Sequence, residues 1–269
     1  MNLKRKKRNK CVLCLNFYSN KEMSEEHYPA KSVGNEDIIK LDFIKMANSF
    51  MTDDLIKYSS KHENIGKSIK EIADDYFDNE LSQSIYPKGR TARTLCRKCN
   101  TFLGKYDESY KKFYENDGNP SVIGGYQHQT RLNIIKSIYA KFLSVPECKE
   151  MNFDFINFLR NEKLQEYTGE WVVYCLKRDY GTDMMGLKSI DTGMLEYDEG
   201  IIFELSDEKF IFHLMNFTPH EQYRTLNLMD ILEKKYELIS GYDVEGGYHG
   251  LLMIQKMFES FPNVPVNEY

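Results

Sequence analysis

The chain has 269 residues, of which 41% are hydrophobic and 13% aromatic, a composition that excludes an intrinsically disordered protein and suffices for one large or two ordinary domains. Charged residues interrupt every apolar run well before the roughly 18 residues that a membrane-spanning helix needs, which excludes a transmembrane protein. The net charge of −5 divides into +4 for residues 1–120 and −9 for residues 121–269, which excludes a surface that attracts polyanions throughout. We therefore expect any nucleic acid to bind the first half.

The first ten residues form a basic arm, since six of them are Lys or Arg. Such a block of like charges is typical of a flexible arm that binds nucleic acid, and equally typical of a solvated tail that aids solubility. The segment after it, "CVLCLNFYSNK", is too short and too polar for the core of a signal peptide, so we expect a cytoplasmic protein. In that reducing compartment the six cysteines are expected to be metal ligands or buried thiols and not disulfides.

The first half is predicted to be loop-rich and then helical. Residues 11–34 are short of regular patterns, whereas residues 37–85 look helical because "EDIIKLDFIKMANSF" and "IGKSIKEIADDYFDNEL" space apolar residues by three and four. "YPKGRT" breaks this pattern, and "TARTLC" after it can form a short strand. We then expect one helix over "NTFLGKYDESYKKFYE" and a linker over "NDGNPSVIGG", residues 116–125.

The second half is predicted to be α+β with an antiparallel sheet. "TRLNIIKSIYAKFL" is an amphipathic helix with Leu132, Ile135, Tyr139 and Phe142 on one stripe. "WVVYCLKR", "GIIFEL" and "KFIFHLMNF" read as strands, and "SDE" between the last two suits a hairpin. "TLNLMDILEKKYEL" returns to a helical pattern.

Two pairs of cysteines carry metal-ligand spacing. Cys11/Cys14 and Cys96/Cys99 are both C-x-x-C pairs, and a tight turn in each can aim two thiolates at one tetrahedral ion. The 81 residues between the pairs must loop out and return, and the alternative is four unrelated buried thiols. The remaining cysteines, Cys148 and Cys175, lack paired spacing and are expected to be core thiols.

A carboxylate and an imidazole lie between the two pairs, in "SEEHYPAKSVG", residues 24–34. The dipeptide Glu26-His27 alone is a weak indication of a functional site, because chance often places such a pair on a protein surface. Its position after one cysteine pair, together with the amide of Asn100 directly after the other pair, favours a site. The alternative for Asn100 is a helix N-cap, a role that asparagine fills well.

Taken together, these motifs resemble the HNH endonucleases and their ββα-metal fold. The zinc-knuckle subgroup carries C-x-x-C, then Glu-His-x-x-Pro, then C-x-x-C followed by His or, as in the phage junction-resolving branch, Asn. The resemblance covers residues 8–115 and nothing in residues 121–269. One position departs from the pattern: the central Asn of the family's triplet falls on Thr91.

The resemblance in residues 8–115, together with the sequence patterns of the rest of the chain, predicts an α+β chain of three parts. A flexible arm, residues 1–10, would precede a zinc-clamped ββα-metal nuclease domain, residues 11–120, with a helical insertion at about 37–85. An α+β accessory domain with an antiparallel sheet, residues 121–269, would then select a partner or substrate.

The resemblance also implies the roles of the site residues. Cys11, Cys14, Cys96 and Cys99 would hold a structural Zn²⁺ ion. Glu26 and Asn100 would bind a catalytic Mg²⁺ or Mn²⁺, for which their hard oxygen donors are suited. If the Glu26-His27 pair ends a strand, His27 points away from Glu26 and can act as the general base across the scissile phosphate. The products would carry 5′-phosphate and 3′-hydroxyl ends.

Further residues flank this predicted site. Asp107 follows Asn100 by two helical turns and is expected behind the metal ligands, or alternatively as a solvent-facing or loop-capping residue. His62, in "KHEN", is expected at the surface. Basic residues near the site are expected to contact phosphates, or else to be ordinary surface. The predicted nucleic-acid contacts are Lys4, Arg5, Lys6, Lys7, Arg8, Arg90, Arg93, Arg97 and Lys98.

Three hypotheses for the function follow. The first is a metal-dependent HNH endonuclease that hydrolyses DNA, acting in bacterial antiviral defence or restriction, with RNA open as a substrate. The second is a non-catalytic, zinc-dependent nucleic-acid-binding module, against which the retention of Glu26, His27 and Asn100 counts. The third is an RNA-cleaving toxin component, licensed by a regulatory protein that binds residues 121–269.

Overall fold

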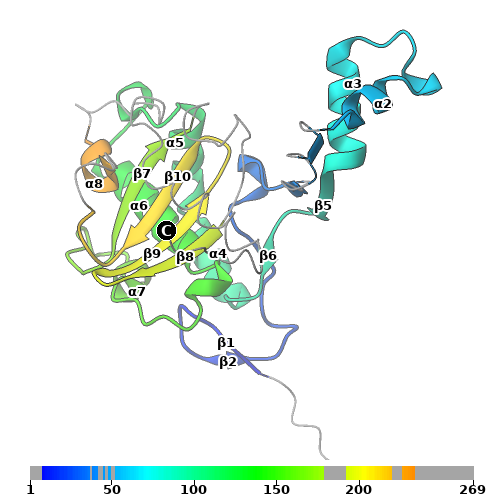
Figure 1. Ribbon diagram of the computed structural model, residues 1–269. Coiled ribbons are helices and arrows are strands. Elements are labelled where there is room, and N and C mark those ends of the chain that lie inside the picture. Colours follow the sequence, from blue (N-terminus) through cyan, green and yellow to red (C-terminus); the bar gives the residue numbers. More distant parts are fainter. Residues whose placement is uncertain are drawn as a thin grey trace, which may run out of the picture. The chain divides into compact units, whose positions relative to one another are not determined.

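A computed structural model of the chain describes residues 8–36, 38–41, 45, 48–49, 52–178, 192–219 and 226–233 (Figure 1). Most of the predicted basic arm, including Lys4, Arg5, Lys6 and Lys7, lies outside these residues, as do residues 225 and 234–238 of the helix predicted in "TLNLMDILEKKYEL". The described chain is mixed α+β. It forms two compact units, which we call the insertion unit (Asn35–Arg90) and the main unit (Met1–Gly34 with Thr91–Tyr269).

The insertion unit spans Asn35–Arg90, where the sequence predicted a helical insertion at about 37–85, and it is not entirely helical. Strand β4 (Ile38–Leu41) pairs antiparallel with β5 (Ser82–Tyr86), so the helix predicted over "EDIIKLDFIKMANSF" is wrong at its start. The run Ile-Ile-Lys-Leu satisfies helical spacing but is also β-branched and short, and a partner strand decides between the two. Helices α2 (Asp54–Ser59) and α3 (Ile69–Tyr76) follow, and Phe77–Leu81 extends α3 as a π-helical turn.

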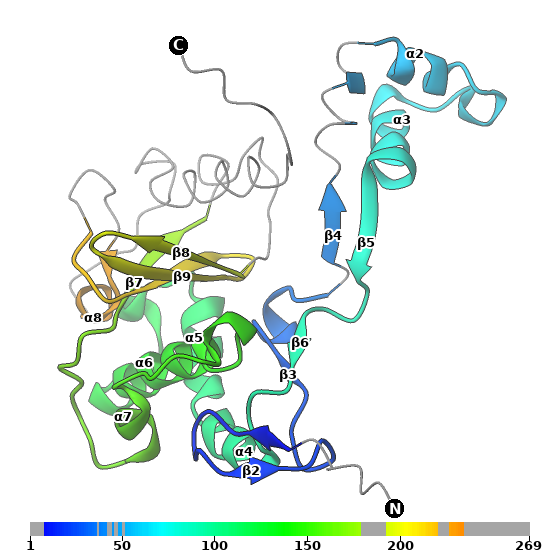
Figure 2. The same cartoon turned by 60° about the horizontal axis from the view of Figure 1, so that its bottom comes forward.

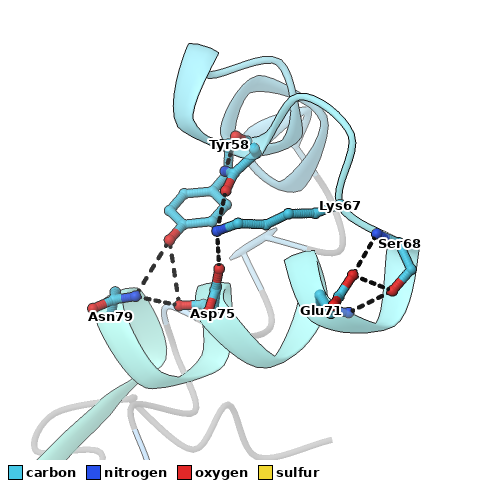
Figure 3. A network of polar contacts seen from close by, with 7 residues as sticks. Tyr58, Lys67, Ser68, Glu71, Asp75 and Asn79 are labelled. Atoms are coloured by element: carbon cyan, nitrogen blue, oxygen red, sulfur yellow. Dashed lines mark hydrogen bonds and ion pairs between the residues drawn. The ribbon is translucent and has the colours of Figure 1, made fainter.

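Polar contacts fix the start and the packing of α3 (Figure 3). Ser68 caps the helix, because its hydroxyl accepts from the backbone N–H of Glu71 while the Glu71 carboxylate accepts from the Ser68 backbone at 2.7 Å. Tyr58, on α2, donates its hydroxyl to the Asp75 carbonyl at 3.3 Å. The ring of Tyr58 packs edge-on against Tyr76, with centroids 5.0 Å apart. These contacts give the insertion unit a small core of its own.

A buried asparagine ties the two ends of the insertion unit together. Asn35 accepts a hydrogen bond from the Arg90 backbone N–H at 2.7 Å and donates to the Arg90 carbonyl at 3.0 Å. Both backbone polar groups of Arg90 are thereby satisfied where the chain leaves this unit.

The main unit contains the predicted antiparallel sheet. Its strands lie in the order β11-β7-β10-β9-β8, and the hairpin predicted around "SDE" joins β9 to β10. The strand β8 was not predicted, and β7 and β10 pair along their full length. The strand bounds are β7 (Val172–Lys177), β8 (Thr192–Tyr197), β9 (Gly200–Ser206), β10 (Phe210–Met215) and β11 (Leu226–Asn227).

Helices α5 (Asp107–Glu115) and α6 (His128–Phe142) pack against one face of this sheet (Figure 2). Aromatic rings join the layers, since the Phe113 centroid lies 5.0 Å from that of Phe210 and the Tyr110 centroid 6.1 Å from that of Phe212. The four residues of the predicted α6 stripe, Leu132, Ile135, Tyr139 and Phe142, are all buried. Two short helices, α7 (Ile156–Arg160) and α8 (Leu228–Ile231), complete the unit.

The chain does not divide near residue 120, where the sequence predicted a linker. Pro120–Val122 forms a short 3-10 helix with Pro120 buried, and Ile123 belongs to the same core as α5 and α6. The two sides of the expected boundary therefore share one hydrophobic core, and the compact units separate at 34/35 and 90/91 instead. No helix among the described residues has the length and apolar content needed to cross a membrane.

Candidate functional site

The four cysteines of the two C-x-x-C pairs come together in the main unit. Their sulfur atoms all lie within 4.8 Å of one another, although 81 residues separate the pairs. Cys11 and Cys14 lie in the turn between β1 (Asn9–Lys10) and β2 (Phe17–Tyr18), and Cys96 and Cys99 lie at the start of α4 (Arg97–Gly104). The alternative of four unrelated thiols is therefore wrong.

The geometry and charge of this cluster fit a metal ion. Tetrahedral zinc–thiolate bonds of about 2.3 Å place sulfurs roughly 3.8 Å apart, which is compatible with four sulfurs that all lie within 4.8 Å of one another. The pKa of Cys11 is lowered to about 4, chiefly by a hydrogen bond from the Cys99 thiol and to a smaller extent by backbone hydrogen bonds. The same Cys11–Cys99 hydrogen bond raises the pKa of Cys99. Cys96 N–H also donates to the Cys11 sulfur at 3.3 Å. These four residues could hold a metal such as zinc, whereas Cys148 and Cys175 are buried in the core as expected.

The backbone around the cysteines places Glu26 and His27 beside α4. Strand β3 (Glu26–His27) pairs antiparallel with β6 (Thr91–Ala92), and Met23 forms a bridge with Cys96. His27 lies directly opposite Thr91, the position where the family pattern has Asn. The Thr91 hydroxyl donates to Glu25 at 3.3 Å, so this residue fastens the neighbouring strand through its side chain.

Asn100 lies inside helix α4 and is not its N-cap. Cys96 is the N-cap residue, the helix begins at Arg97, and the Asn100 backbone N–H already bonds the Cys96 carbonyl at 3.0 Å. The Asn100 side chain instead donates to the Ser24 hydroxyl at 3.1 Å, on the segment that leads into β3. Its amide thus links the helix to the strand of Glu26 and His27, which excludes the capping alternative.

One cavity of about 390 Å³ is lined by all the predicted catalytic residues. Glu26, His27 and Asn100 line it together with Asp107 and Lys141. Glu26 is only 9% exposed, and its Oε1 atom accepts no hydrogen bond within the described part of the chain. Burial raises the pKa of Glu26, while contacts with Ser24 and Lys141 oppose that rise. A buried carboxylate oxygen without a donor is costly and is suited to bind a cation.

Asp107 reaches the cavity by a different route from the predicted one. The single helix expected over residues 100–115 is two helices, because α4 ends at Gly104 and Asp107 opens α5. Glycine favours such an end, and an acidic first turn favours such a start. The Asp107 carboxylate accepts a hydrogen bond from Ser137 at 2.9 Å and pairs with Lys141 at 3.2 Å, so it connects α5 to α6.

A second cavity, of about 330 Å³, adjoins the first through Glu25, which lines both. Lys21, Arg93 and Arg97 line it, and Arg93 forms an ion pair with Glu25 at 3.3 Å. This hydrogen bond from Arg93, helped by Thr91, lowers the pKa of Glu25. The arrangement gives the predicted catalytic cavity a basic neighbour.

The other predicted nucleic-acid contacts lie elsewhere. Lys98 is exposed on α4, and Arg8 is exposed before β1. Arg90 belongs to the insertion unit, where its guanidinium lies 5.4 Å from the centre of the Tyr86 ring. His62 is exposed in a 3-10 helix of that unit, as expected.

Sequence reasoning missed several residues of the site, among them Ser24 and Lys141. Ser24 binds Asn100, and Lys141 lines the cavity, but neither belongs to a motif. Ser24 does carry a weak signal, since it opens the "SEEHYP" segment. Lys141 carries only the oddity of a charge in the last turn of a largely buried helix.

Comparisons with protein-family models, curated proteins and solved structures gave no significant match for this chain.

Proposed function

We propose that this protein is a metal-dependent endonuclease of the HNH type, which hydrolyses DNA phosphodiester bonds to 5′-phosphate and 3′-hydroxyl ends. The observation that carries the proposal is the single cavity lined by Glu26, His27 and Asn100 beside a cluster of four cysteines. These residues come from a strand and a helix that are far apart in the sequence. The cysteine cluster joins the start of that helix to the β1–β2 turn, and Met23, shortly before the strand, forms a bridge with Cys96. A structural zinc ion in this cluster would make the site rigid.

The donor set fits a catalytic Mg²⁺ or Mn²⁺ ion. Glu26 has a buried oxygen that accepts no hydrogen bond in the described chain, and the Asn100 amide supplies a second hard oxygen. Few protein ligands suit these ions, because the remaining positions are then open to water and to phosphate oxygens. When bound, the cation would stabilise negative charge on the phosphate and on the leaving oxygen.

The protein side chains would perform the proton transfer and the docking. His27 follows Glu26 in a strand, so the two side chains leave the backbone on opposite sides, and both line the cavity. An imidazole in this position can accept a proton from the attacking water at neutral pH. Arg93, Arg97 and Lys21 in the adjoining cavity would hold phosphates of the strand on either side of the scissile bond.

A substrate panel tests this proposal. Protein purified without chelators is incubated with supercoiled plasmid, linear duplex, single-stranded DNA and RNA, each with Mg²⁺, Mn²⁺ or no added metal. We expect metal-dependent cleavage of DNA. Ligase should reseal a nicked duplex product, because its ends would carry 5′-phosphate and 3′-hydroxyl groups. Cleavage of RNA alone would transfer the site to the RNA-cleaving alternative, and no cleavage of any substrate would refute the proposal.

Two variants of Asn100 test whether its side-chain oxygen binds the catalytic metal or whether the side chain only donates a hydrogen bond to Ser24. Asn100→Ala should lower cleavage at about 5 mM Mg²⁺ by at least about 100-fold, because it removes one of two side-chain metal ligands. Asn100→Asp should retain more activity, since it keeps an oxygen donor. Zinc content and the melting temperature should stay near wild type in both variants, because Asn100 is not the helix cap. Full activity of Asn100→Ala at low Mg²⁺ would show that Asn100 only binds Ser24.

A further inference from the structure

Lys141 lies in the cavity although it lies outside the motifs on which the proposed nuclease function rests. It belongs to the last turn of α6, within the segment that the sequence assigned to an accessory domain. Its side chain is only 17% exposed, and it lines the cavity together with the motif residues Glu26, His27 and Asn100. Enclosing a lysine costs free energy, because the side chain loses hydration and conformational freedom. A role in solubility alone therefore does not explain this position.

Contacts on α5 and α6 hold the Lys141 ammonium in place. Its Nζ atom lies 3.2 Å from Asp107 Oδ2, and Asp107 Oδ1 accepts from the hydroxyl of Ser137, one helical turn before Lys141. Asp107 takes one of the three donors of the ammonium group. A cation that is fixed before substrate arrives stabilises developing charge better than one that must first be ordered.

The neighbouring lysines show that this placement is specific. Lys136, on the same helix, is turned into the core, where it donates to the Asn161 carbonyl at 2.9 Å and lies 4.7 Å from the centre of the Phe158 ring. It does not line the cavity. Lys31 does line the cavity but is exposed. Lys141 is therefore the enclosed lysine of this cavity among the described residues.

The charge of the cavity calls for such a cation. Its wall carries the carboxylates of Glu25, Glu26 and Asp107, and each of them repels the negative charge of a phosphodiester. Charge on the phosphate increases as the transition state forms, when an oxygen attacks and another leaves. An ammonium group close to Asp107 offsets this repulsion where the phosphate must enter.

We propose that Lys141 contacts the scissile phosphate and stabilises its charge in the transition state, as a catalytic residue supplied by α6. This inference depends on the proposed nuclease function of the same cavity. In that case residues 1–120 do not contain the complete active site. The packing of α5 and α6 in one core then contributes to catalysis, because it places Lys141 in the cavity.

The test compares steady-state DNA cleavage by four full-length proteins. Lys141→Met keeps the apolar stem and removes the charge, and Lys141→Arg keeps a charge. Lys112→Met is the control, because Lys112 is exposed on α5, forms an ion pair with Glu108 and does not line the cavity. We expect Lys141→Met to lower kcat by about 100-fold or more, with a much smaller change in KM. Lys141→Arg should be intermediate, and Lys112→Met should match wild type. Zinc content and melting temperature should be unchanged in all four.

Three outcomes would overturn the inference. If wild type cleaves DNA, His27→Ala does not, and Lys141→Met stays within about threefold of wild type, then Lys141 does not contact the phosphate and the nuclease proposal stands. If Lys141→Met loses zinc or melts much earlier, Lys141→Gln repeats the test, and full activity in that folded variant assigns Lys141 to the α5–α6 contact. If wild type cleaves no nucleic acid, both proposals fail together.

Discussion

Replacing His27 with alanine should lower DNA cleavage by about 100- to 10,000-fold while leaving DNA affinity near wild type. The imidazole is proposed to remove a proton from the attacking water, a step that affects the reaction and not the docking of substrate. His27 lies in a two-residue strand whose backbone pairs with β6, so its side chain is not needed for that pairing. Initial rates at saturating DNA, together with binding of uncleaved DNA in Ca²⁺, would measure the two properties separately.

The matched control is His62→Ala, because His62 is exposed in the insertion unit and does not line the cavity. This variant should cleave at the wild-type rate. Cleavage by His27→Ala within a few-fold of wild type would refute the assignment of the base.

Loss of the metal at the four cysteines should unfold the main unit around them. The cluster joins the β1–β2 turn to the start of α4, and Cys11 and Cys96 are both almost fully buried. Zinc binding to such a site contributes about 10–16 kcal/mol in small zinc domains, more than the total stability of most domains. We therefore expect one zinc ion per chain, and Cys96→Ser should abolish it and lower the melting temperature by more than 10 °C, roughly.

Cys148→Ala is the control for this experiment, since Cys148 is buried in the same core but does not belong to the group of four cysteines. It should keep the zinc and cost only the few kcal/mol, roughly, of a small core cavity. Elemental analysis and thermal unfolding give both readings on the same samples. Absence of zinc in wild type purified without chelators would contradict the prediction, as would Cys96→Ser and Cys148→Ala behaving alike.

The parts of the molecule that could be read from the sequence are those with short-range causes. A C-x-x-C pair aims its two sulfurs through one tight turn, so the proximity of Cys11 to Cys14 follows from spacing alone. The apolar stripe of α6 and the hairpin between β9 and β10 are local patterns of period 3.6 and period 2. These predictions are confirmed.

The failures share a non-local cause. Residues 38–41 satisfy a helical spacing, and only their pairing with residues 82–86, far along the chain, makes them a strand. The linker-like segment after Glu115 has turn residues, yet the packing of α5 on α6 places it inside one core. The same packing brings Lys141 to the cavity, and no spacing rule relates Lys141 to Glu26.

Asn100 shows most clearly where prediction from the sequence alone fails. An asparagine near the start of a helix fits an N-cap and a metal ligand equally well by residue type. The structure excludes the cap because the helix begins three residues earlier, at Arg97. The position of a helix start is among the least reliable parts of a sequence-based prediction, and here it decides against the cap.

The metal dependence of cleavage by wild type and Glu26→Gln tests the central claim most directly. Glutamine has the size of glutamate but lacks the charge of the buried Oε1 that would bind the cation. Both proteins are desalted into chelator-free buffer, so that zinc stays in place, and cleavage is followed as Mg²⁺ or Mn²⁺ is added. We expect no cleavage by wild type before metal is added, cleavage after it, and a metal requirement in Glu26→Gln that is raised by at least about 10-fold, or no activity at all. The same metal requirement in both proteins, or cleavage by wild type without added metal, would contradict a catalytic metal site at Glu26.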